Sequence, residues 1–230
     1  MRRFWTNVEV AADGTAWGLT LDGKAVRTPA RLALTVPDQA LAEAIAEEWR
    51  AVATEMDPRA MPLTGLANAA IDRVAPDRAA FASGLARYAE ADLACYRSEW
   101  PPELVARQAQ SWDPLLEWGR RRFDVDFVTT TGLIHVPQPP ATIERLSHEV
   151  AALDAYRLAG LSPLVTVGGS LLAALAVLDG QFEPEAAWEA VSVDDRWQLE
   201  QWGSDKDAEL ALDSRQRDFL AAARFLALLD

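Results

Sequence analysis

The segment "SVDDRWQLEQWG", residues 192 to 203, carries the side chains best suited to chemistry or recognition. At about 100° per residue of an α-helix, one stripe of this segment holds a carboxylate and two amides, Asp194, Gln198 and Gln201. Two indoles border the stripe, Trp197 on one side and Trp202 on the other. A helix that packs on its neighbours normally turns an apolar stripe inward. This polar stripe therefore indicates an active site, a polar seam in the core, or a surface that holds another protein.

The start of this helix has a second interpretation. Ser192 followed by Asp195 has the spacing of a helix N-cap. Asp194 and Asp195 then lie in the first turn, where carboxylates complement the free N–H groups and the helix dipole. Arg196 and Glu200 are expected on the opposite side. Capping explains both aspartates without a function, but it does not explain the two amides, so Asp194 is either a cap or a contact to a partner.

Motifs of enzymes are incomplete in this sequence. "HEVAA", residues 148 to 152, begins like a zinc-protease motif, but Ala152 stands where the second histidine ligand is required. "GGSLL" lacks the second glycine of a nucleophile elbow. The two lysines, Lys24 and Lys206, do not follow a glycine-rich phosphate loop. We therefore expect no catalytic residue, no metal site and no cofactor; a small-molecule enzyme with a cleft in the helical part is the alternative.

Charge and composition restrict the partners. The 230 residues carry a formal net charge of −13 and give a pI of about 4.6, which disfavours nucleic acid and anionic lipid. The only cysteine, Cys95, excludes an intramolecular disulfide. The most apolar stretch, residues 161 to 180, is interrupted by Pro163 and the Gly168–Gly169 pair, and we expect a central buried helix rather than a membrane span. No export signal is visible at the start, so a soluble protein without membrane insertion is predicted.

The pattern of residues 4 to 36 predicts a β meander. Leu19 and Leu21 alternate with polar positions, and Asp13-Gly14 and Asp22-Gly23 are typical of hairpin turns. After Pro37 the period changes to that of a helix. Its apolar stripe includes Trp49, and we expect this helix to cover the open face of the sheet, with Trp49 as a structural residue in the seam.

From about residue 60 the pattern is mainly helical. Asp113-Pro114 predicts a junction between two helices, because proline favours the first helical position. Residues 125 to 139 predict an extended excursion or a hairpin. The fold class is therefore α+β, with a small antiparallel sheet and packed helix over residues 1–58 and a larger, orthogonal-bundle-like helical domain over residues 59–230.

Several phrases in order along the chain resemble one family, the assembly chaperones that act on the alpha subunit of the F-type ATP synthase head. The phrases are "LDGKAVRTP" (21–29), "EEW" (47–49), "MPLTGLANAAIDRV" (61–74), "RYAEADLACYR" (87–97), "LVARQAQSWDPLLEW" (104–118), "GLIHVPQP" (132–139), "GSLLAALAV" (169–177) and "VDDRWQLEQWG" (193–203).

The resemblance implies a chaperone that needs no nucleotide. It would hold the free alpha subunit, shield the surface later buried against the beta subunit, and release it during assembly. The family's critical acidic position falls on Asp194, and its conserved tryptophan after the sheet falls on Trp49. The missing presequence and the arginine-rich composition point to a bacterial cytoplasm, whereas eukaryotic relatives act in the mitochondrial matrix.

Together these observations predict a partner-binding face. The stripe and its indoles suit a surface that holds a partner without trapping it. Apolar contact supplies affinity, while the charge and the two amides align the partner and are easily solvated again when it leaves. The predicted contacts are Asp194, Gln198, Gln201, Trp197 and Trp202.

Overall fold

The computed structural model describes residues 2–132, 134–203 and 205–229. The chain forms two compact units. Unit 1 contains the residues up to Arg78, Asp154–Gly160 and the residues from Arg224, and unit 2 contains Ala79–Leu153 and Leu161–Ala223. These units follow contacts in space, whereas the boundary between residues 58 and 59 divides the chain by sequence and stays a prediction.

Unit 1 is built on the predicted antiparallel sheet. Strand β1 (Val8–Asp13) pairs with β2 (Ala16–Leu21), and β2 also pairs with the short strands β3 (Lys24–Ala25) and β4 (Thr35–Val36). The two predicted hairpin turns are confirmed. Gly14 and Gly23 lie at φ +64° and +76°, a region that glycine adopts without steric strain.

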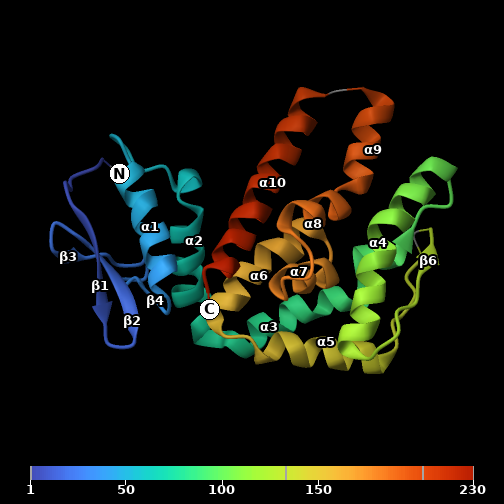
Figure 1. The fold of residues 1–230 in the computed structure, drawn as a ribbon, viewed down its shortest axis with the longest axis horizontal. Coiled ribbons are helices and arrows are strands. Elements are labelled where there is room, and N and C mark those ends of the chain that lie inside the picture. The colour runs from blue at the N-terminus through green and yellow to red at the C-terminus, as the bar shows by residue number, and fades with distance from the viewer. Residues whose placement is uncertain (1, 133, 204, 230) are drawn as a thin grey trace. The chain divides into compact units, whose positions relative to one another are not determined.

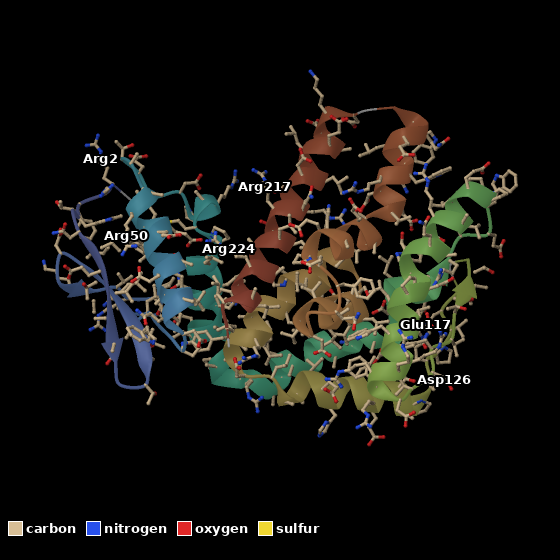
Figure 2. The ribbon with its side chains drawn as sticks, in the orientation of Figure 1. Arg2, Arg50, Glu117, Asp126, Arg217 and Arg224 are labelled. Carbon is tan, nitrogen blue, oxygen red and sulfur yellow. The ribbon has the colours of Figure 1, made fainter. Side chains whose placement is uncertain are left out.

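Helix α1 (Gln39–Ala51) packs on this sheet, as expected, and lies beside it in Figure 1. The apolar stripe is buried throughout: Leu41, Ile45, Trp49 and Val52. Arg50, labelled in Figure 2, lies on α1 at the edge of the seam. Its Nη2 donates to the Val8 carbonyl at 3.1 Å, so a backbone acceptor of β1 is satisfied. The period change at Pro37 therefore predicted both the helix and the face that it buries.

The rest of unit 1 is helical. Helix α2 (Pro62–Ala69) continues through a π-helical turn (Ala70–Val74) and a 3-10 turn (Ala75–Asp77) towards α3 (Arg78–Ala86). The beginning of α6 joins this unit through Tyr156, whose hydroxyl donates to the Thr35 carbonyl at 2.8 Å. Gly160 packs so closely on Phe225 and Leu226 that an added Cβ would come within 3.0 Å of both side chains.

Unit 2 is mainly helical, so the predicted α+β class is confirmed. Its core contains Trp112, Trp188 and Phe219, each at most 1% exposed. Between its helices lie the 3-10 turns Arg87–Ala91 and Leu93–Cys95. No helix of the described ranges is both long and apolar enough to cross a bilayer. The helices that lie wholly or partly in this unit are α3, most of which belongs here, α4 (Pro102–Phe123), α5 (Pro140–Ala152), α6 (Ala155–Gly168), α7 (Leu171–Leu178), α8 (Pro184–Val191), α9 (Val193–Trp202) and α10 (Lys206–Ala227).

The predicted junction at Asp113-Pro114 is wrong, because α4 runs unbroken through Pro114. Proline removes one hydrogen bond, the one that its N–H would give to the carbonyl of Gln110. Gln110 is exposed, so water can satisfy that carbonyl. On either side of the proline, Trp112 and Leu115 are buried, and their packing keeps the helix continuous.

The apolar stretch from 161 to 180 forms two helices rather than the single one expected. Gly169, at φ +70°, breaks the chain between α6 and α7. Ser170 then caps α7 by accepting from the Ala173 N–H at 3.0 Å. The buried carboxylate of Asp92 accepts from the Ser170 hydroxyl at 2.8 Å and the Leu172 N–H at 2.9 Å, which holds the start of α7 in place.

The segment from 125 to 139 is an extended excursion, as one of the two predictions stated, and not a hairpin. Its strand β6 (Thr130–Thr131) pairs in parallel with β5 (Tyr96–Arg97), which lies just before α4. The amide of Gln138 closes the excursion, because it accepts from the Val128 N–H at 2.9 Å and donates to the Val128 carbonyl at 2.8 Å. Leu133, part of the predicted segment, lies outside the described residues.

Candidate partner-binding face on helix α9

Ser192 stands at the predicted N-cap position of α9, but its side chain does not cap. The hydroxyl donates to the Trp188 carbonyl at 2.7 Å and accepts from Nε of Arg196 at 2.9 Å. Ser192 is also the C-cap of α8, and its backbone (φ −104°, ψ 11°) is not in the extended conformation of a typical N-cap. Spacing therefore predicted the helix start correctly and the hydrogen bond incorrectly.

Asp194 faces α4. Its Oδ1 accepts a hydrogen bond from Nε2 of Gln108 at 2.7 Å. Gln108 is 1% exposed, and its Oε1 accepts from the Ser98 N–H at 2.7 Å. The Asp194 carboxylate is therefore the partly exposed end of a polar chain that begins in the core, and its Oδ2 makes no hydrogen bond within the described part of the molecule.

Trp197 lies on the same side of the helix. The Arg107 guanidinium of α4 stacks over its ring, 4.8 Å from the centroid, and also pairs with Glu200 at 2.7 Å. A cation over an indole and an ion pair share one arginine here. Asp194, Trp197 and Glu200 thus form the side of α9 that meets α4, and the expectation that Glu200 lies opposite Asp194 is wrong.

The opposite side of α9 borders a groove of about 430 Å³, which α10 closes from the other side. We call it the α9–α10 groove; its lining is Asp195, Gln198, Leu199, Trp202, Gly203, Asp205, Ala208, Ala211, Leu212 and Arg215. The Asp195–Arg215 ion pair, at 2.8 Å, ties the two helices together at one end. Gln198 and Trp202 belong to this groove, and Trp202 is 81% exposed.

The five predicted contacts therefore do not converge on one point. Asp194 and Trp197 lie towards α4, Gln198 and Trp202 line the groove, and Gln201 is exposed. Such an arrangement presents polar and aromatic groups around a helix to a large partner. It does not bring two acids, or an acid and a nucleophile, together on a small substrate.

Trp49 lies in the seam between α1 and the sheet and is 6% exposed. Its ring centroid is 5.2 Å from that of Trp5, and the Trp5 indole N–H donates to the Trp49 carbonyl at 3.4 Å. The indole N–H of Trp49 has no partner among the described residues. Its surroundings are those of a packed aromatic side chain, consistent with the structural role predicted for it.

The titratable groups with altered pKa values in unit 2, Asp92 and Cys95, support the fold and do not point together into a site. Burial raises the pKa of Asp92, whose oxygens accept hydrogen bonds at the start of α7. Burial and the nearby Asp92 raise the pKa of the Cys95 thiol to about 12, so this thiol is protonated at neutral pH. Within the described ranges, no group of three or more His, Cys, Asp or Glu side chains could hold a metal ion.

Sequence reasoning missed the residues that support α9 from its neighbours. Gln108 lies in α4 on one stripe with Leu104, Trp112 and Leu115, all buried. A polar side chain on an apolar stripe requires a partner, so this spacing was the available signal. Arg215, which joins α9 to α10, had no such local signal, since its partner lies 20 residues away.

Three comparisons place this geometry among known proteins. The family model described as ATP12 chaperone protein matches residues 2–120. The mitochondrial protein atp12 of Schizosaccharomyces pombe is 26% identical over 238 residues, which are 98% of this chain and 82% of that protein. The crystal structure of Atp12 from Paracoccus denitrificans has 41% identity and a TM-score of 0.95, over 100% of this chain and 98% of that chain.

The Atu1473 protein from Agrobacterium tumefaciens has 35% identity and a TM-score of 0.95, over 100% of this chain and 86% of that one. The family model covers more than half of the sequence, and the structural similarity extends over both units. This chain belongs to the ATP12 chaperone family.

Proposed function

We propose that this protein is an ATP-independent assembly chaperone of the F-type ATP synthase. It binds the free alpha subunit of the catalytic head, prevents its aggregation and delivers it for assembly with beta. The observation that carries this proposal is membership of the ATP12 chaperone family, with a match to Paracoccus Atp12 along the whole chain. The eight ordered phrases that resemble the alpha-subunit chaperones support the choice of client.

The exposed parts of α9 suit such a client. Trp202 offers a large apolar surface to solvent, and tryptophan is a frequent anchor in protein interfaces. Gln201 is exposed and Asp194 is partly exposed, so their polar atoms can contact a partner and return to water on release. We assign Asp194, Trp197, Gln198, Gln201 and Trp202 to client binding on this basis.

The same face argues for binding without catalysis. A chaperone of this kind needs no phosphate-binding loop, and the sequence carries none. We therefore propose that it acts without nucleotide, metal or other cofactor. The similarity to Atp12 of the bacterium Paracoccus denitrificans supports the proposal that it does so in a bacterial cytoplasm.

The test combines capture with aggregation. A tagged copy expressed in its host should retain free alpha subunit, identified by mass spectrometry. Purified protein should suppress light scattering by unfolded alpha subunit at near-stoichiometric ratio, equally with and without ATP. Suppression that requires ATP, or retention of a metabolite in place of the alpha subunit, would contradict the proposal.

A further inference from the structure

The α9–α10 groove has a floor that no other part of unit 2 fills. Leu199 on α9 faces Ala208, Ala211 and Leu212 on α10. Ala208 and Ala211 are three residues apart, so they lie on one face of their helix, and both are exposed. Their short side chains leave space for apolar side chains of a partner, and the exposed Trp202 lies at the edge of the groove.

The surroundings of this groove are acidic. Residues 193 to 215 contain seven acidic and three basic side chains. Of the basic ones, Arg215 pairs with Asp195 and Arg196 donates to Ser192, so both are engaged within unit 2, and Lys206 is exposed between Asp205 and Asp207. Asp205 lines the groove, and the exposed Asp207 follows it in the first turn of α10.

The geometry of the groove suits a helix. It runs between α9 and α10, and the Asp195–Arg215 ion pair ties these two helices together at one end. From Asp195 to Trp202 the helix rises about 10 Å, which is the length of two helical turns. The lining contains no strand, so an added β-strand would find no backbone to pair with.

Charge selects among the occupants of such a groove. A negative rim repels phosphate groups of lipids and nucleic acids. A second copy of this chain, with a net charge of −13, would bring the same acidic surface and is disfavoured as well. A helix with an apolar stripe between basic side chains can pack its stripe on the apolar floor of the groove and pair its basic side chains with the acidic residues around it.

We propose that the α9–α10 groove seats an amphipathic helix of the client, two turns of which contact the floor. Its apolar stripe packs between Trp202 and Leu212, and its flanking arginine or lysine side chains meet Asp205 and Asp207. The identity of the client rests on the proposed function, whereas the preference of the groove for a basic amphipathic helix does not.

Two synthetic peptides test this preference. Both carry the same leucine stripe, and one has arginines where the other has glutamates on the flanks. In fluorescence anisotropy the arginine peptide should bind at least about tenfold more tightly, and added salt should reduce the difference. Equal affinity of the two peptides, or no binding of either, would overturn the inference.

Substitutions locate the binding. Ala211→Trp fills the groove from an exposed position and should weaken binding of the arginine peptide at least about tenfold. Ala208→Trp is a second way to fill it if the first variant melts early. Leu210→Trp is the matched control, because Leu210 is 62% exposed on the same helix and does not line the groove. Peptide binding by both filled variants at the wild-type level would overturn the inference.

Capture of the alpha subunit separates the two proposals. Wild type and Leu210→Trp should retain the alpha subunit, and Ala211→Trp should lose it. If wild type binds the arginine peptide but never the alpha subunit, the proposed client is wrong and the groove inference stands. If the alpha subunit is captured equally by both filled variants, the proposed function stands and the groove inference is wrong.

Discussion

Helix α1 in unit 1 and helix α9 in unit 2 carry similar residues for different purposes. Each places tryptophan near acidic side chains. Trp49 on α1 is 6% exposed and packs on Trp5, whereas Trp202 on α9 is 81% exposed. The seam around α1 is closed by the protein itself, while α9 keeps a large aromatic surface open to solvent.

The acids differ in the same way. Glu48 on α1 accepts three hydrogen bonds at the start of α2, from the Leu63 N–H at 2.8 Å, the Thr64 N–H at 2.8 Å and the Thr64 hydroxyl at 2.7 Å. Asp194 accepts one, from Gln108. An acid whose acceptor sites are used internally stabilises the fold, whereas one with an unused oxygen retains capacity for a partner.

Changing Trp49 gives the largest expected effect. Trp49→Arg places a charge without a partner in the seam and should lower the free energy of unfolding by about 3 to 5 kcal/mol. The variant should misfold rather than merely lose binding, as thermal melting and solubility will show. Trp49→Phe, which keeps an apolar ring, is the control and should fold. A soluble Trp49→Arg protein with an unchanged melt would mean that the seam is not closed.

Removing the Glu48 carboxylate is expected to have the next largest effect. Glu48→Ala leaves three donors at the start of α2 without their acceptor and should cost about 2 to 3 kcal/mol. Glu47→Ala is the matched control, because Glu47 is exposed and its ion pair with Arg224 is long, at 3.9 Å. It should change stability by less than about 0.5 kcal/mol in urea unfolding. Equal losses of stability in the two variants would contradict a special role of the Glu48 carboxylate at the start of α2.

The pH dependence of the Glu48 effect has a defined sign. Burial raises the pKa of Glu48 above its usual 4.5, although the hydrogen bonds from Thr64 and Leu63 oppose the rise. The pKa of Glu48 is higher in the folded protein than in the unfolded one. The contribution of Glu48 to the free energy of unfolding is therefore complete below the unfolded pKa and declines as pH rises through the folded pKa. The stability difference between wild type and Glu48→Ala should therefore shrink above about pH 4.5, and a growing difference would contradict the raised pKa.

Substitutions of Asp194 distinguish a role within the protein from a direct contact with the client. Asparagine can still accept from Gln108, so Asp194→Asn should melt like wild type and bind the alpha subunit somewhat less well. Asp194→Lys leaves the buried Gln108 amide with only the Ser98 hydroxyl as acceptor and opposes the helix dipole, for a loss of about 1 to 2 kcal/mol and a larger loss of capture. Arg196→Ala, on the other side of α9, should retain capture. If capture falls only in proportion to melting temperature, Asp194 has no direct contact with the client.

Trp202 should give the smallest change in stability and a clear change in binding. Trp202→Ala removes a side chain that is mostly in solvent, so the free energy of unfolding should move by less than about 0.5 kcal/mol. Alpha-subunit capture should fall roughly tenfold. Trp100→Ala is the matched control, since Trp100 is 76% exposed and precedes α4. Equal capture by the two variants would argue against Trp202 as an anchor.

Local chemistry in the sequence determined much of the fold. The Asp-Gly pairs predicted the hairpins because aspartate and glycine tolerate positive φ, and Asp22 does lie at φ 48°. The apolar stripe through Trp49 predicted α1 and its buried face because the period of a helix is a property of the backbone. For the candidate site, the helical period placed Asp194 and the two indoles on α9.

The tertiary structure decided which neighbours those side chains meet. Pro114 lies inside α4 because buried side chains on both sides outweigh one lost hydrogen bond, a balance that the sequence around the proline does not show. Likewise, the 100° step of a helix fixes the angles between Asp194, Trp197 and Trp202 but not the partner on each side. Gln108 and Arg215 come from helices far away in the chain, and only packing brings them to opposite sides of α9.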